Sequence, residues 1–222
     1  MRGDLLSAAL RRESPSFDAD DELTRRILDA ALAQFNDFGL RRTTVDDVAR
    51  RSGLSRITIY RRFAKKDNLI EAVLQREVRR FLAGLQATID AQSTPAGRIV
   101  ESCAFSVQYL RGHPLLNRLL ATEPEAIVPW LTVRGGPVIA AVRERIAAVM
   151  RREVYGAGPV PDGAAHAIDV AAEVCVRLTL SFVLTPPTVV PLDTADDARR
   201  FARQYALPMY AALLEQAKPG RR

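Results

Sequence analysis

The feature that most restricts the fold of this chain is the spacing of three residues in the run VARRSGLSRITI. Ala49, Gly53 and Ile59 are separated by four and then six residues. A small side chain at Ala49 lets two helices approach closely, and Gly53 can adopt the positive φ that a tight turn demands. Ile59 would then face inward and fix the second helix. This spacing predicts two short helices joined by a tight turn, which is a helix-turn-helix motif.

Capping residues set the limits of these two short helices. Thr44 opens a run like a capping box, with Asp47 in place of the usual Glu or Gln, for a helix that ends near Arg51. Ser55 is placed to cap the second helix, residues 56–63. The turn and the inward-facing side chains are expected to form a small core, made of Val45, Val48, Ala49, Gly53, Leu54, Ile59 and Phe63.

Apolar residues recur at spacings of three and four along most of the chain. They predict a helix from residue 20 or 21 to Phe38, with Phe38 on its apolar side and Gly39 as its stop. A long fourth helix is expected from about residue 66 to 92. Further helices are predicted near residues 95–111, 114–121, 124–131, 136–154, 164–184 and 194–218, the last with a kink at Pro208. No stretch alternates convincingly with a period of two, so the predicted fold class is all-α.

Positive charge is concentrated around the predicted turn. Residues 40–66 contain nine Arg or Lys residues and two Asp residues, which gives this segment a net charge of +7. The formal net charge of the whole chain is +6, so the remainder carries −1. Such a local concentration predicts an anionic partner, and double-stranded DNA fits it best. On the spacing alone the segment could equally be a helical hairpin with a solvated basic face; the caps and the segregated charge favour DNA.

The second helix of the motif would present its outer face to the major groove. With Ile59 and Phe63 buried, the residues expected to face the groove are Arg56, Ile57, Thr58 and Arg61. Arginine can bind guanine through two hydrogen bonds, and Ile57 can contact a thymine methyl group. Contacts to DNA phosphates are predicted for Arg42, Thr43, Thr44, Tyr60, Lys65 and Lys66, and Arg41 could reach the same strand or the minor groove.

The run from Phe38 through TTVDDVARRSGLSRITIYRRFAKKDNLIEAVL resembles the N-terminal DNA-binding region of the TetR family of bacterial transcription regulators. The resemblance is carried by Thr44, Ser52, Gly53, Ser55, Ile59, Tyr60, Phe63, Lys66 and the stretch from Asp67 to Leu69. It implies that Thr44, Tyr60 and Lys66 bind phosphates and that the four groove residues face the bases. Ile57 and Arg62 stand where many relatives have Gly and His, so individual base contacts do not carry over.

The resemblance also implies how the rest of the chain is organised. TetR-like proteins are usually homodimers in which the two final long helices of each subunit pack together, and the middle helices bind a small effector. The expected parts are a flexible arm (1–18), a helix-turn-helix domain (19–66), a helical effector-binding and dimerisation domain (67–218) and a tail (219–222). The long fourth helix joins the head to the larger domain. The homodimer would form through the helices near residues 164–184 and 194–217.

Candidates for the effector pocket are aromatic, long apolar or charged residues of the middle helices. They are Phe105, Tyr109, Leu116, Trp130, Met150, Arg177 and Phe182. Each of the apolar ones could equally be plain core, and Arg177 could instead pair with Glu173 four residues earlier.

These features predict a cytoplasmic repressor that binds a palindromic operator and is released by a small effector. Two alternatives remain open: a constitutive dimeric DNA-binding protein without effector, and an all-α enzyme with an incidental basic hairpin. The sequence shows no nucleophile–base pair, metal-ligand cluster or phosphate-cradling glycine loop, so no catalytic residue, metal or cofactor is assigned. Cys103 and Cys175 lack metal-ligand spacing, and no apolar run approaches the roughly 20 residues of a membrane span.

Overall fold

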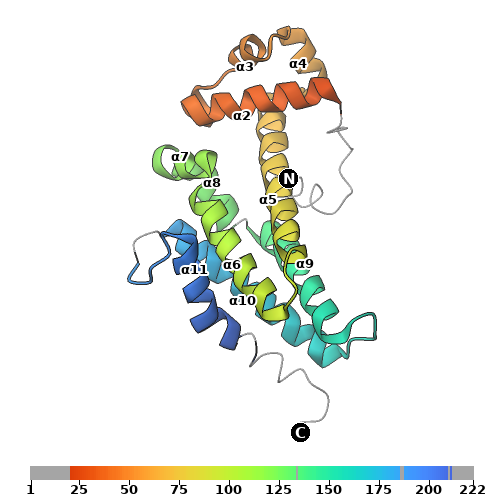
Figure 1. The fold of residues 1–222 in the computed structure, drawn as a ribbon. Coiled ribbons are helices and arrows are strands. Elements are labelled where there is room, and N and C mark those ends of the chain that lie inside the picture. Colours follow the sequence, from red (N-terminus) through yellow and green to blue (C-terminus); the bar gives the residue numbers. More distant parts are fainter. Residues whose placement is uncertain (1–20, 134, 186–187, 210, 212–222) are drawn as a thin grey trace. The chain divides into compact units, whose positions relative to one another are not determined.

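The computed structural model describes residues 21–133, 135–185, 188–209 and 211, without the side chains of Trp130 and Pro137. The predicted arm and tail lie outside this part of the chain. All regular structure within it is helical, which confirms the all-α prediction. The elements are α2 (Glu22–Arg42), α3 (Val45–Ser52), α4 (Arg56–Arg62), α5 (Lys66–Asp90), α6 (Pro95–Arg111), α7 (Pro114–Thr122), α8 (Pro124–Leu131), α9 (Gly136–Tyr155), α10 (Asp162–Leu184), α11 (Ala195–Phe201) and the π-helical turn η1 (Ala202–Ala206) (Figure 1). Within the same residues, none of the helices is both long and apolar enough to cross a lipid bilayer.

The chain divides into two compact units, and α5 contributes to both. The first unit runs to Arg80 and adds His113–Gly135, so it contains α2, α3, α4, α7, α8 and the first part of α5. The second unit has Phe81–Gly112 and the chain from Gly136 onward, and so contains the rest of α5, α6, α9, α10, α11 and η1. The predicted functional boundary between residues 66 and 67 falls at the start of α5 and stays a prediction.

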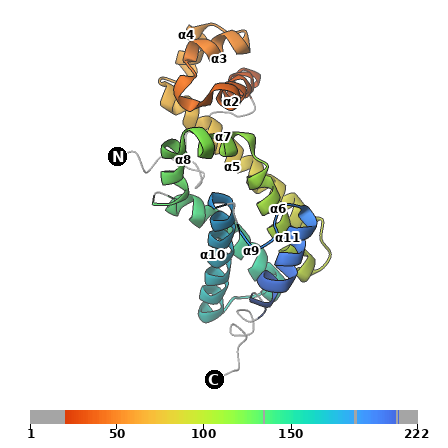
Figure 2. The same ribbon diagram turned by 90° about the vertical axis from the view of Figure 1, so that its left-hand side faces the viewer.

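In the first unit, α3 and α4 lie on one side of α2, and α7 lies on the other (Figures 1 and 2). One continuous apolar core joins these helices. Its most deeply buried members are Ile27, Phe35, Val48, Ile59, Phe63, Leu69, Val73, Leu115 and Leu119. Burying one such side chain contributes about 1.5–3 kcal/mol. The helix-turn-helix therefore shares its core with α7, which follows it in sequence by about fifty residues.

In the second unit, α10 packs against α9 and α6, and α11 packs against α6 (Figure 2). Phe81 stacks on Phe105 with a ring-centroid distance of 5.9 Å, and Tyr109 lies 5.5 Å from Phe81. Gly84 makes room for this cluster, because a Cβ at that position would lie 2.6 Å from the Phe105 ring. The close approach of α5 and α6 in this unit thus depends on a glycine.

The predicted caps are present and explain where α3 and α4 begin. The Thr44 hydroxyl accepts the Asp47 N–H and the Asp47 carboxylate accepts the Thr44 N–H, which confirms the capping box. The Ser55 hydroxyl accepts the N–H of Thr58 at 3.1 Å. Gly53 has φ 66°, the left-handed conformation that the turn required.

The ends of α2 and of the last helix show how far the prediction holds. The chain leaves helical geometry at Gly39 (φ 82°, ψ 172°), so the first continuous helix stops there as predicted, and a short helical segment follows the kink as far as Arg42. Phe38 is 53% exposed rather than packed, although Phe35 before it and Leu40 after it are buried. Near Pro208, which lacks an N–H, the irregularity lies one turn earlier in η1, where the Leu207 N–H bonds the Ala202 carbonyl. The predicted extension of this helix beyond residue 211 lies outside the described residues.

Candidate nucleic-acid interface

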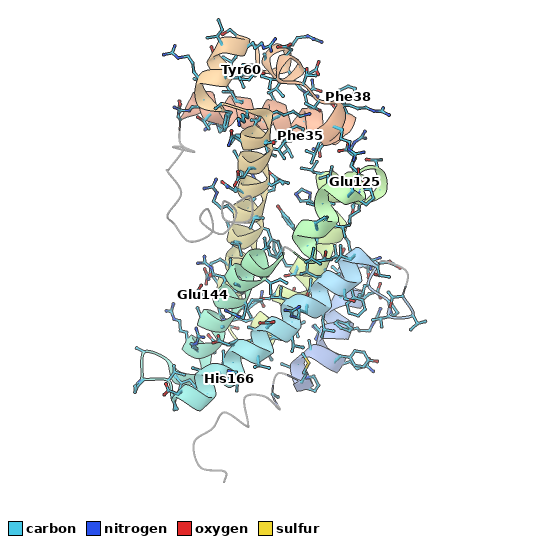
Figure 3. All side chains as sticks on the ribbon, turned by 180° about the vertical axis from the view of Figure 1, so that it is seen from behind. Phe35, Phe38, Tyr60, Glu125, Glu144 and His166 are labelled. Carbon is cyan, nitrogen blue, oxygen red and sulfur yellow. The ribbon has the colours of Figure 1, made fainter. Side chains whose placement is uncertain are left out.

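The helix-turn-helix is built on the predicted core. Val48, Ile59 and Phe63 are almost completely buried, Val45 and Ala49 are buried, and Leu54 is half-buried. The turn itself is closed by the Gly53 N–H, which bonds the carbonyls of Ala49 and Arg50. Figure 3 shows the side chains around this core, with Tyr60 labelled on α4 and Phe35 on α2. The core fixes which side of α4 is left to face a partner.

The outer side of α4 is apolar and basic. Ile57 is 72% exposed, and Arg56 and Arg61 on either side of it are also exposed. Thr58 is half-buried, and its hydroxyl lies 2.8 Å from that of Ser55, so it takes part in the cap. Isoleucine between two arginines is a suitable surface for a thymine methyl flanked by guanine or phosphate.

Arg56 is held in place at the start of α4. Its guanidinium forms two contacts of 3.3 Å with the Asp46 carboxylate and lies 5.3 Å above the centre of the Tyr60 ring. Arg50 pairs with Asp47 at 3.5 Å in the same region. Ion pairs between exposed groups stabilise a protein by only about 0–1 kcal/mol. Little stability is therefore lost when these arginines leave their aspartates to bind DNA.

Two predicted phosphate contacts, Arg42 and Lys65, and the predicted groove residue Arg61 carry free positive charge. Arg42, Arg61 and Lys65 are exposed and form no ion pair within the part of the chain that the structure describes. Lys66, at the first position of α5, donates from Nζ to the carbonyl of Arg41 at 3.2 Å. Tyr60 is partly exposed on α4. These groups lie on elements of one unit, as a common phosphate-binding surface requires.

The two threonines before α3 have structural roles. Thr43 is only 2% exposed, and its hydroxyl donates to the Gly39 carbonyl at 2.8 Å. The prediction that this side chain contacts phosphate is therefore wrong, because its hydroxyl is buried and donates to a carbonyl within α2. Thr44 is exposed, but its hydroxyl donates to Asp47 at 2.6 Å, so a phosphate would have to displace that carboxylate. The hydrogen bonds from Thr44 hold the pKa of Asp47 below its ordinary value, and the cap stays ionised at neutral pH.

Two arginines that the sequence reasoning did not assign brace the motif. Arg62 donates from Nε to the Thr24 hydroxyl at 2.8 Å and forms an ion pair with Asp21. This contact ties the end of α4 to the first turn of α2. Arg26 donates to the Ser52 carbonyl at 2.8 Å, which satisfies a free carbonyl at the end of α3. The partners are separated by 26 to 41 residues, so no local sequence signal reveals them.

Within the second unit, the apolar residues predicted for the pocket belong to separate clusters. Phe105 and Tyr109 meet, with ring centroids 5.4 Å apart, beside Phe81. Leu116 belongs to the core of the first unit, Met150 packs between α9 and α10, and Phe182 packs edge-on against Phe201. Arg177 is exposed and pairs with Glu173 at 2.8 Å. The Trp130 side chain lies outside the described residues.

The two thiols are poor nucleophiles. Burial raises the pKa of Cys103 to about 12, and burial also raises the pKa of Cys175. The thiolate is the reactive form, so neither cysteine is activated for covalent chemistry at neutral pH. Across residues 21–211, as far as they are described, no group of His, Cys, Asp and Glu side chains could hold a metal ion.

Comparison with known families divides the chain between two models of one family. The model described as "Bacterial regulatory proteins, tetR family" matches residues 27–73, which hold the helix-turn-helix. The model described as "Bacterial Tetracyclin repressor, C-terminal domain" matches residues 96–203. Together they cover more than half of the chain.

Known relatives agree over most of the length. An uncharacterized HTH-type transcriptional regulator of Mycobacterium tuberculosis is 26% identical over 202 residues, which are 88% of this chain and 91% of the relative. The regulator AlkX of the same organism is 26% identical over 195 residues, 83% and 88% of the two chains. The crystal structure of the TetR family repressor AlkX from Dietzia sp. matches with a TM-score of 0.62 at 21% identity, covering 87% of this chain and 98% of that one. The chain therefore belongs to the TetR family and is a DNA-binding transcriptional regulator rather than an enzyme.

Proposed function

We propose that this regulator is a repressor that binds a palindromic operator as a homodimer and leaves it when a small-molecule effector binds. The observation that carries the DNA-binding part is the exposed Ile57 between Arg56 and Arg61, with Ile59 completely buried behind them. The repressor role is supported by the family model of the C-terminal region and by the AlkX repressor from Dietzia.

Dimerisation is expected because one short recognition helix distinguishes few base pairs. Two such helices about 34 Å apart on a palindrome multiply the discrimination. The candidate dimer surface lies on α10, where Val170 and Leu178 are each 39% exposed and Val174 between them is half-buried. Residues four apart lie on one side of a helix, so these three form an apolar stripe. Tyr205 in η1, also exposed, adds an aromatic side chain from the other predicted interface helix.

Leu178→Asp is expected to convert the dimer to a monomer, because association would bury a carboxylate without a partner. Sedimentation velocity should show the monomer mass, and a gel shift should show loss of binding to the full palindrome. Val133→Asp is the matched control, since Val133 is 89% exposed and lies outside α10. A Leu178→Asp protein that sediments as a dimer would remove α10 from the proposed interface.

Effector release would act through α5. This helix carries Lys66 at its first position and continues without a break to Asp90, which belongs to the second unit. A ligand that favours a different tilt of α5 would change the spacing of the two recognition helices and weaken operator binding. The aromatic cluster of Phe81, Phe105 and Tyr109 supports an apolar or aromatic effector.

The effector proposal is tested on DNA that the protein itself selects. Duplexes would be recovered from a random pool, and their release measured against n-alkanes, fatty acids and aromatic compounds; the Dietzia AlkX repressor, implicated in biodegradation of n-alkanes, motivates the first class. Release by one class supports the proposal. Binding that is indifferent to every compound favours the alternative of a dimeric regulator without an effector.

Lys66→Ala is expected to weaken binding to all duplexes and to lower the salt dependence by up to about one unit of slope, since one phosphate contact is lost. The measurement is the dissociation constant as a function of salt concentration. Arg79→Ala removes an exposed cation from the same helix, outside the predicted interface, and should leave both quantities unchanged. Wild-type affinity and slope in Lys66→Ala would exclude this residue from the interface.

A further inference from the structure

The bend in α2 is filled by a carboxylate from a distant part of the sequence. Gly39 has φ 82° and ψ 172°, a backbone conformation that is essentially restricted to glycine. A Cβ on Gly39 would lie 2.0 Å from Oε1 of Glu123, which sits between α7 and α8. Glu123 is 6% exposed, and its Oε2 accepts the N–H of Arg41 at 3.1 Å. Because glycine has no Cβ, the Glu123 carboxylate fits against Gly39 and accepts a hydrogen bond from the backbone of the bend.

Hydrogen bonds from the Arg41 N–H compensate the burial of the Glu123 carboxylate, and an arginine lies close to the same bend. A buried carboxylate is costly unless hydrogen bonds or a cation compensate it. Arg118, whose buried Nε has no hydrogen-bond partner among the described residues, lies 3.7 Å from the same Gly39 Cβ position. The Arg41 guanidinium pairs instead with Glu125 at 2.6 Å. Figure 3 labels Glu125 on α8 and Phe38 near the bend of α2. The corner between α7 and α8 thus binds Arg41 through both its backbone and its side chain.

The same bend carries part of the predicted phosphate-binding surface. Arg42 directly follows it, and the Arg41 carbonyl accepts the hydrogen bond from Lys66 Nζ at 3.2 Å. The Thr43 hydroxyl closes it from inside by bonding the Gly39 carbonyl. A change in the bend therefore moves Arg42 and alters the support of Lys66. Glu123 itself lies outside the helix-turn-helix and outside residues 27–73, which match the DNA-binding family model.

We propose that Glu123 is a positioning residue for DNA binding: its buried carboxylate holds the bend from Gly39 to Arg41 so that Arg42 and Lys66 can meet phosphates together. The inference rests on the proposed phosphate contacts of these two residues. It does not depend on the existence of an effector. It assigns to the corner of α7 and α8 an indirect part in the strength of DNA binding, through the position of these two residues.

The test replaces Glu123 with Ala, which removes the carboxylate, and with Asp, which keeps the charge but withdraws it by one methylene group. On duplexes selected by the wild-type protein, both variants should bind roughly ten-fold more weakly or worse, with a salt slope lower by about one to two units. Preference for the selected duplex over a scrambled one should persist, because α4 is untouched. A purely stabilising role for Glu123 would leave the salt slope of the folded protein unchanged.

Glu144→Gln is the matched control, since Glu144 is an exposed acid on α9 in the second unit and its loss changes the net charge equally. It should show wild-type affinity and slope. Circular dichroism establishes that each variant is folded at the assay temperature; if the Ala variant does not fold, the Asp variant decides. A folded Glu123 variant with wild-type affinity and slope overturns the proposal. If Lys66→Ala itself leaves the slope unchanged, the phosphate assignment has failed independently of Glu123.

Discussion

Phe63→Ala is expected to lower the free energy of unfolding of the first unit by about 3–5 kcal/mol, the usual cost of truncating a buried phenylalanine. Phe63 is 1% exposed, follows the last residue of α4, and donates its N–H to the Ile59 carbonyl at 2.8 Å. Its ring closes the core between α4 and the other helices of the unit. The cavity would therefore loosen the attachment of the recognition helix as well as reduce burial.

Chemical denaturation followed by circular dichroism measures this loss. Phe38→Ala provides the matched control, because Phe38 is 53% exposed and its truncation should change stability by no more than about 0.5 kcal/mol. DNA binding should fall in parallel with the unfolding of α4 in the Phe63 variant. Equal effects of the two substitutions would contradict the assignment of Phe63 to the core and Phe38 to the surface.

Gly39→Ala should destabilise the first unit by about 3–5 kcal/mol, since it combines backbone strain with overpacking. The new Cβ would meet the Glu123 carboxylate at 2.0 Å, so one of the two elements would have to move. Gly53→Ala offers a direct comparison at another positive φ, 66°, where the nearest atom is Nη2 of Arg26 at an ordinary 3.6 Å. Strain alone predicts about 1–2 kcal/mol there.

The two contributions at Gly39 can be separated by a double-mutant cycle. Adding Glu123→Ala to Gly39→Ala removes the clash but leaves the backbone strain. The double variant should thus be less destabilised than the sum of the single variants, with a coupling above about 0.5 kcal/mol. Additive losses, measured by denaturant unfolding of all three proteins, would show that the carboxylate and the glycine do not compete for the same space.

Local patterns in the sequence were sufficient to predict the helix-turn-helix. The caps at Thr44 and Ser55 and the turn at Gly53 involve partners within four residues, so the spacing of residue types contains the necessary information. The same holds for the start of α6 at Pro95 and for its last residue, Arg111. Helical period also predicted which side of α4 is buried, because Ile59 and Phe63 lie one turn apart.

The sequence could not show which positions are covered by elements distant in the chain, or which polar contacts those elements make. The helical period placed Phe38 on the apolar side of α2, but it does not show which positions on that side a distant element covers, and Phe38 is 53% exposed. Thr43 could be assigned to phosphate only while its bond to the Gly39 carbonyl was unknown. Glu123 gave no signal at all, since its partner Arg41 lies 82 residues earlier. The predicted pocket residues of the second unit lie in separate clusters for the same reason, because composition identifies apolar side chains but not which of them meet.

The shared core of the first unit has a practical consequence for chimeric regulators. The simplest chimera would join the DNA-binding part of this chain to the C-terminal part of a relative at a single cut. A cut after Arg80 would separate Leu115, Leu119 and Ile127 from the core residues that they pack against. It would also expose Ile27 and Phe35. A chimera that takes His113–Gly135 together with the residues up to Arg80 keeps this apolar core intact. The unit to exchange is therefore discontinuous in sequence.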